Sequence, residues 1–298
     1  MGIPLTEGAR ITATRRMAGV PTTAIPRTED ARTTETRITA PDARITEIPR
    51  TAAGVPITAI RATETHVTRA RGRGAPFRHE LKFLVTRGEG FALSSRFSAL
   101  FARDGHAGAD GRYEVHSLYF DTPDDRALRE KLYGLRDKEK FRLRYYGEDV
   151  SFVRLEKKIK RGELCAKFSA VLPEGGAEAL LAGRADFLLE SDEPLFAEFY
   201  AKMRGGPLRP SAAVSYSREA FVYAPGGVRV NIDRDLRRCL DAREFLNPRR
   251  FGVPADGGFD LLEVKYGAFL PDVARMAVQT AACGRSAFSK YAECRRFE

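Results

Sequence analysis

The sequence is poor in the residues that build thiolate metal sites and disulfide frameworks, since its 298 residues include only four Cys and four His. The cysteines, Cys165, Cys239, Cys283 and Cys294, show no pair at a metal-binding spacing, and the histidines are scattered likewise. We therefore expect neither a zinc site nor a disulfide framework. A metal bound here would be a hard cation such as Mg²⁺ or Mn²⁺, which takes carboxylate and phosphate oxygens.

Long apolar runs are also missing. No stretch is long enough to span a membrane, and the N-terminal region has no signal with an apolar core. We expect a cytoplasmic protein with no membrane span in this chain. The sequence leaves its oligomeric state open.

Residues 1–75 contain no Phe, Tyr or Lys, and they hold 12 Arg against 7 acidic residues. Near-repeats such as Arg10-Ile11-Thr12-Ala13 and Arg37-Ile38-Thr39-Ala40 recur in them. So little large apolar surface cannot offset the entropy lost on ordering. We therefore predict a disordered low-complexity extension over 1–75 and a folded domain over 76–298. The extension carries +5 (12 minus 7) of the chain's +10, so the domain is only mildly basic.

Two neighbouring stretches, 140–147 and 153–162, alternate charged and apolar side chains. A strand sends alternate side chains to opposite faces, so each stretch would have one charged and one apolar face. The polar break at 147–149 predicts an antiparallel hairpin. Its charged face would carry Lys140, Arg142 and Arg144 from one strand, and Arg154, Glu156, Lys158 and Lys160 from the other.

Four further stretches have the same alternation: 78–85, 214–218, 229–233 and 261–266. The commonest outcome of such a pattern is a half-buried sheet whose charged face is solvated. If the strands instead close into a barrel with the charged faces inward, its interior would be water-filled and mostly cationic. Such an interior would suit a polyanion.

Helices are expected at 91–103, at 122–132, from 172 through 203, and from 271 to about 282. Their apolar stripes would cover the apolar outer face of the strands. We therefore predict an α+β fold, an antiparallel β-barrel tunnel of about eight strands with helices packed on the outside. A nucleic-acid partner is not expected, because the cations alternate along strands and do not cluster on a helix or loop.

Eight short motifs carry a family resemblance, in order, over more than two hundred residues. They are Glu80-Leu81-Lys82, Ser117-Leu118-Tyr119-Phe120-Asp121, Arg142-Leu143-Arg144-Tyr145-Tyr146-Gly147, Glu156-Lys157-Lys158, Tyr216-Ser217-Arg218, Asn231-Ile232-Asp233, Glu263-Val264-Lys265 and Ser289-Lys290-Tyr291. The stretch from about Arg78 to Tyr291 resembles the polyphosphate polymerase (VTC) domain family, a branch of the triphosphate tunnel metalloenzymes.

The resemblance implies a metal-dependent transfer of the γ-phosphoryl group of ATP onto a polyphosphate chain. It implies catalytic cations at Lys82, Arg142, Arg144, Lys158, Arg218 and Lys290, and further substrate contacts at Tyr216, Ser289, Lys160 and Lys265. It makes Glu263 the first candidate ligand for Mn²⁺ or Mg²⁺, with Asp233, Glu156 and Glu80 as further carboxylates.

Two other functions stay open: a tunnel triphosphatase that hydrolyses triphosphate or a nucleoside triphosphate, and a module that binds polyphosphate without turnover. The hydrolase branch usually opens with two Glu and a Lys at alternate positions. Here Arg78 stands at the first of them, leaving Glu80 and Lys82. This departure favours the polymerase branch and puts a second metal in doubt.

Overall fold

The computed structural model describes residues 76–280 and 284–296, so the prediction for residues 1–75 lies outside the described residues. Eight long strands make up most of the fold: β1 (Arg78–Thr86), β3 (Arg112–Asp121), β4 (Lys138–Tyr146), β5 (Asp149–Arg161), β6 (Leu164–Val171), β7 (Arg209–Tyr223), β8 (Val228–Arg238) and β10 (Phe259–Tyr266).

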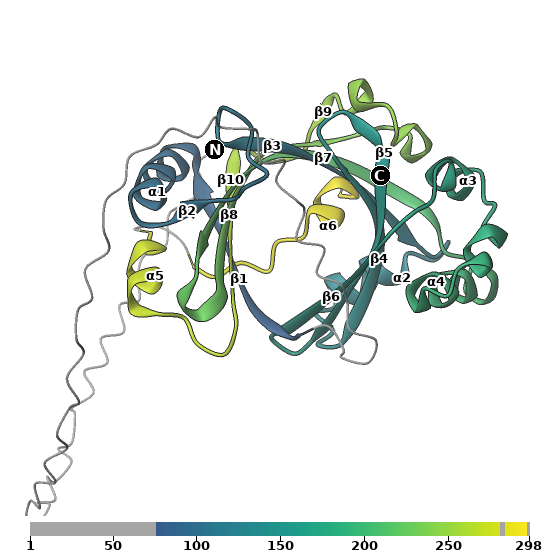
Figure 1. Cartoon of the computed structure of the whole chain (residues 1–298), viewed down its shortest axis with the longest axis horizontal. Coiled ribbons are helices and arrows are strands. Elements are labelled where there is room, and N and C mark those ends of the chain that lie inside the picture. The colour runs from purple at the N-terminus through teal and green to yellow at the C-terminus, as the bar shows by residue number, and fades with distance from the viewer. Residues whose placement is uncertain (1–75, 281–283, 297–298) are drawn as a thin grey trace, which may run out of the picture. The chain divides into compact units, whose positions relative to one another are not determined.

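These strands form a closed antiparallel barrel in the order β7-β3-β4-β5-β6-β1-β10-β8, and β8 pairs back with β7 (Figure 1). Two short strands extend the sheet, β2 (Ala102–Arg103) beside β7 and β9 (Val253–Pro254) beside β8. The predicted barrel of about eight strands is therefore confirmed. The predicted hairpin is formed by β4 and β5, and its turn uses Gly147 at φ 58°, a left-handed conformation that favours glycine.

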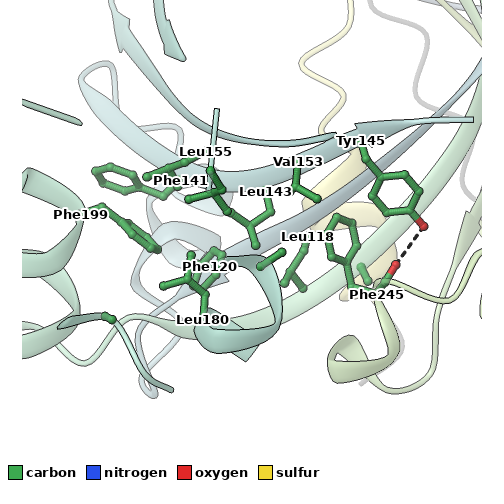
Figure 2. Close-up of a cluster of buried hydrophobic side chains, with 14 of the residues drawn as sticks. Leu118, Phe120, Phe141, Leu143, Tyr145, Val153, Leu155, Leu180, Phe199 and Phe245 are labelled. Carbon is green, nitrogen blue, oxygen red and sulfur yellow. Dashed lines mark hydrogen bonds between the residues drawn. The ribbon is translucent and has the colours of Figure 1, made fainter. Parts of the chain in front are cut away.

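The apolar faces of the strands point outward, as predicted. On one side, Phe141 and Leu143 of β4 pack against α3 (Gly176–Leu181) and α4 (Pro194–Gly205), for example against Leu180 and Phe199 (Figure 2). The hydroxyl of Tyr145 donates to the backbone oxygen of Phe245 at 3.0 Å, which ties the loop after β8 to the same cluster.

A second core lies under α1 (Arg87–Leu100) and α5 (Asp272–Ala277), on the opposite side of the barrel in Figure 1. Leu262 and Val264 of β10 are fully buried there, together with Phe97 of α1 and Ala274 of α5. The barrel therefore has its main hydrophobic cores outside the strands, because its inner face is largely charged.

Several predicted helix boundaries are wrong. α1 begins at Arg87, before the predicted residue 91, because Thr86 and Glu89 form a capping box. It ends at Leu100, so the predicted end at residue 103 lies in β2. α2 (Arg126–Leu132) starts after the predicted Thr122, since Asp125 at its N-cap takes a left-handed conformation with φ 56°.

The long helix predicted from 172 through 203 is divided into α3, the 3-10 turn η1 (Asp186–Glu190) and α4. Gly183, at φ 75°, follows the end of α3, and Pro194 opens α4, so two residues that interrupt helices account for the division. α5 ends at Ala277, short of the predicted residue 282; part of that prediction lies outside the described residues. The remaining 3-10 turns are η2 (Pro225–Gly227), η3 (Ala242–Glu244) and η4 (Pro248–Arg250).

One further helix was not predicted from the sequence, and unlike the predicted helices it does not pack outside the barrel. α6 (Lys290–Cys294) lies within the ring of strands (Figure 1). Its Tyr291 and Cys294 are buried against inward-facing residues such as Val214 and Leu236. Five residues are too few to show a helical period, so the sequence pattern does not place this helix. Within residues 76–280 and 284–296, no helix combines the length and apolar character needed to cross a bilayer.

The outer cores predict a stability difference between two equal truncations. Leu143→Ala should lower the free energy of unfolding by about 2–5 kcal/mol, because Leu143 is fully buried under α3 and α4. Leu189→Ala is the matched control, since the side chain of Leu189 is exposed. Urea unfolding of both variants measures the difference. Equal values for the two would contradict an outward-facing core at Leu143.

Candidate functional site

The inner face of the barrel places opposite charges directly across neighbouring strands. Lys82 of β1 lies opposite Glu263 of β10, and Arg142 of β4 lies opposite Glu156 of β5. Cross-strand pairs of opposite charge stabilise a sheet. This register lets many ionised groups share one enclosed space.

Glu263 lies at the centre of the largest group of cations. Its carboxylate oxygens are 3.2 Å from the ammonium groups of Lys82 and Lys265, 3.4 Å from that of Lys290 and 3.5 Å from the guanidinium of Arg218. Burial raises the pKa of Glu263, but the four cations outweigh this effect and hold the pKa well below 4.5. The carboxylate is therefore ionised at neutral pH.

Asp233 of β8 holds Arg218 and Lys290 in place. The guanidinium of Arg218 donates two hydrogen bonds to it, from Nε at 2.6 Å and from Nη2 at 2.8 Å, and the Nζ of Lys290 lies at 2.5 Å. Such a two-point contact fixes the plane of the guanidinium as well as its position. α6 thereby delivers its lysine to the middle of the barrel.

Glu156 is the centre of a second group. It accepts from Arg142 at 2.8 Å through Nε and 2.6 Å through Nη2, and from Lys167 at 2.8 Å, while Nη1 of Arg144 lies at 3.7 Å. Burial raises the pKa of Glu156, but these cations hold it well below 4.5. Glu80 similarly bridges Lys158 at 2.6 Å and Lys82 at 3.3 Å.

The phenol of Tyr216 connects the two groups. Its oxygen accepts from Nη2 of Arg144 at 3.0 Å and from Nη2 of Arg218 at 3.4 Å, and the ammonium of Lys290 lies 4.4 Å from its ring centre. Because the oxygen only accepts in these contacts, the phenolic hydrogen is directed elsewhere. Tyr216 can thus donate to an anion held by the same cations.

The sequence profile of the VTC domain matches residues 77–297. The chain belongs to the VTC domain family. A comparison with curated protein sequences gives no match.

Several solved structures are similar to this VTC domain chain. A candidate adenylate cyclase of Bacillus halodurans is 17% identical, covers 69% of this chain and 87% of its own, and has a TM-score of 0.41. The PH1012 protein of Pyrococcus horikoshii is 14% identical, covers 73% and 98%, and has a TM-score of 0.39. The capping enzyme triphosphatase of Mimivirus is 11% identical, covers 70% and 91%, and has a TM-score of 0.35.

The VTC domain brings most of its predicted site residues into one connected network. The network runs through Lys158, Glu80, Lys82, Glu263, Lys265, Lys290, Asp233, Arg218, Tyr216, Arg144, Glu156 and Arg142. Two predicted residues are not part of it. The hydroxyl of Ser289 caps α6 by accepting from the backbone amide of Ala292, and Lys160 is half-buried near the start of β4.

Sequence reasoning missed several residues that face the same interior. Ser117 accepts from Nε of Arg144 at 3.1 Å, and the hydroxyl of Tyr119 lies 3.4 Å from Nη1 of Arg142. Both belong to one quoted motif and alternate along β3, so their shared face was the available signal. Asn231 is fully buried opposite Glu263, and its side-chain nitrogen has no partner among the described residues. That nitrogen is a donor available to an anion.

The carboxylates do not form a ready-made metal cage in the VTC domain. Among the described residues, no group of three or more His, Cys, Asp or Glu side chains could hold an ion. Glu263 and Asp233 nevertheless share Lys290 as a common neighbour, and both are hard oxygen donors. This arrangement fits Mg²⁺ or Mn²⁺, which binds one or two carboxylates together with substrate phosphates.

The buried carboxylates predict acid sensitivity of the VTC domain. A carboxylate whose folded pKa is depressed stabilises the fold above its unfolded pKa, and this contribution is lost as the pH falls through the folded pKa. For Glu156 the loss should begin below about pH 4.5. Glu156→Gln should lower the unfolding free energy at pH 7 by about 3–5 kcal/mol, since Arg142 and Arg144 lose their counter-charge.

The same variant should lose less further stability on acidification than the wild type. Denaturant titrations between pH 7 and pH 3 measure both effects, with Glu174→Gln on the exposed surface as the control. An acid profile of Glu156→Gln equal to that of the wild type would refute the ionised state of Glu156.

Proposed function

We propose that this VTC domain is a polyphosphate polymerase-type phosphotransferase that moves the γ-phosphoryl group of ATP onto a growing polyphosphate chain. The proposal rests on one observation: Arg144, Arg218 and Lys290 all contact the phenol of Tyr216. Arg142 and Lys82 belong to the same network through Glu156 and Glu263. Five cations fixed within one barrel form a binding site for several linked phosphates.

Phosphoryl transfer demands little covalent chemistry of a protein, so positioning and charge stabilisation supply most of the catalysis. The terminal oxygen of the acceptor chain forms a bond to the γ-phosphorus, and the bond between that phosphorus and the β–γ bridging oxygen breaks. ADP leaves with the electron pair of the broken bond. The fixed guanidinium and ammonium groups would neutralise the charge on the transferring and leaving oxygens.

Carboxylates engage these cations in the barrel, for example Asp233 with Arg218 and Lys290. A bound triphosphate would compete with Glu263 and Asp233 for Arg218 and Lys290, which frees the two carboxylates to bind a cation. Glu263 and Asp233 would then hold Mn²⁺ or Mg²⁺. The metal, when bound, supplies additional positive charge to the phosphate oxygens.

The first residue of β1, Arg78, favours synthesis over hydrolysis as the reaction. Arg78 occupies the position where the hydrolase branch usually has the first Glu, and its side chain is exposed at the end of β1 that pairs with β6. Fewer carboxylates at this end leave fewer ligands for a second metal.

Incubation of the pure protein with ATP and Mn²⁺, followed by a polyphosphate gel, tests the proposal. Long-chain polyphosphate is the expected product. Release of free phosphate without chains would identify a triphosphatase instead. Neither product, with retained polyphosphate binding, would identify a binding module.

The network predicts that single cations are needed for turnover. Arg142→Ala and Arg218→Ala should each lower the rate by about 10²-fold or more, because each removes a fixed charge from the transferring phosphates. Arg249→Ala is the control, since Arg249 is exposed on η4 outside the barrel. Near wild-type rates in both interior variants would exclude these arginines from catalysis.

Glu263→Gln separates a metal ligand from a simple ion-pair partner. If Glu263 holds the metal, the variant should lose Mn²⁺-dependent turnover while metal-free triphosphate binding is retained or slightly tighter, because a competing negative charge is removed. Turnover across a Mn²⁺ titration and triphosphate binding without metal are the two measurements. An unchanged metal dependence would assign the ligand role to Asp233 or Glu156.

A further inference from the structure

Four lysines gather at the end of the barrel where β4 begins. Lys138 and Lys140 lie on β4, Lys160 lies on β5, and Lys131 lies in the last turn of α2. In the ladder between the two strands, Lys138 is directly opposite Lys160. All four side chains are half-buried. We call them the lysine cluster.

α2 is fixed in position by the end of β3. The carboxylate of Asp121 accepts from the backbone amides of Ala127 and Leu128 in the first turn of α2, at 2.8 and 3.0 Å. It also accepts from the hydroxyl of Tyr291 at 2.5 Å. Lys131 is thus presented by a helix anchored both to the barrel and to α6.

The lysine cluster differs from the site around Glu263 in having no carboxylate in direct contact with its ammonium groups; Asp121 and Glu130 act on Lys140 and Lys138 only from a longer distance. Within residues 76–280 and 284–296, none of its four members forms an ion pair. Lys138 donates to the backbone oxygen of Leu135 at 3.0 Å, and the ammonium of Lys140 lies 4.7 Å from the ring centre of Tyr291. By contrast, the neighbouring Lys158 is paired with Glu80 at 2.6 Å.

Like charges directly opposite one another destabilise a sheet, so this arrangement has a cost in stability. Burial, followed by the charges of Lys138 and Lys82, lowers the pKa of Lys140 to about 7, although the carboxylate of Asp121 opposes this shift. Burial and the charge of Lys160 also lower the pKa of Lys138. Proteins keep such unfavourable local arrangements mainly at functional sites.

We propose that Lys131, Lys138, Lys140 and Lys160 form a second anion subsite, which binds the inorganic phosphate chain of the acceptor as it extends beyond the triphosphate site. This inference rests on the proposed function, which it deepens by giving the acceptor its own contacts.

The positions of the cations fit a linear polyanion. Lys138, Lys140 and Arg142 follow one another on the inward face of β4, and alternate residues of a strand are about 7 Å apart. A chain that starts at Arg142 therefore meets the lysine cluster next. Lysine ammonium groups act as point charges with no fixed fork, so they can bind successive phosphates in more than one register.

A nucleotide fits the lysine cluster less well. The ring of Tyr291, an aromatic surface beside it, already contacts the ammonium of Lys140. The lysine cluster therefore binds a ligand through its positive charges, and a phosphate chain carries negative charge along its whole length.

The double variant Lys138→Met/Lys140→Met tests the proposal, with Lys202→Met as the matched control. Lys202 carries the same charge but lies on α4 and pairs with Glu139. Without ATP or metal, the double variant should bind long-chain inorganic polyphosphate at least about tenfold more weakly than the wild type, because it loses two charged contacts. Its affinity for tripolyphosphate and the affinities of Lys202→Met should stay within about twofold of the wild type.

Thermal unfolding separates binding from a structural role. The double variant should keep or raise the melting temperature, because it removes repulsion between like charges. A lowered melting temperature with unchanged polyphosphate binding would overturn the proposal, as would equal polyphosphate affinity in the double variant and Lys202→Met. Lysine-dependent polyphosphate binding in a protein that makes no polymer would support the subsite while refuting the polymerase activity. Polymer synthesis by the wild type, together with equal polyphosphate affinity in the double variant and the wild type, would support the polymerase activity and refute the subsite.

Discussion

Charge pairing across neighbouring strands is the interaction on which this structure depends. Removing an ion from water costs several kcal/mol unless a counter-charge and hydrogen bonds replace its hydration. The barrel meets this requirement through its register, which sets Lys82 against Glu263 and Arg218 against Asp233. Each pairing follows from which residues face each other, so a register slip of one residue would turn these charges toward the outer helices.

The same requirement explains why the apolar cores lie outside the barrel. Because alternate residues of β4 and β10 carry charges inward, their remaining side chains point outward and need cover. α3 and α4 provide it on one side, and α1 and α5 on the other. The interior site therefore depends on these helices as much as on its cations: α3 and α4 cover Leu143, and α1 and α5 cover Leu262.

The alternation of charged and apolar residues made the faces of six strands predictable, and with them the polarity of the barrel. It did not reveal β6, whose sequence Leu164–Val171 includes a single charged residue, Lys167. It also could not place α6 inside the barrel, because a motif of three residues carries no information about depth. The partners of each charge depend on strand register, which pairs residues far apart in the chain, such as Lys82 and Glu263. For that reason the candidate residues could be named from the sequence, whereas their shared network could not.

The closure of the barrel by β1 and β10 has a consequence for how the chain folds. β1 pairs along nearly its whole length with a strand that follows it by most of the domain, and its pairing with β6 is confined to Arg78 and His79. Contacts between residues so distant in sequence form slowly, because a long loop must close before they add stability. Until β10 arrives, β1 presents an unpaired edge that could pair with another chain. The charges at Glu80 and Lys82 disfavour such pairing, so residues that serve the interior of the finished barrel also protect its first strand from aggregation during folding.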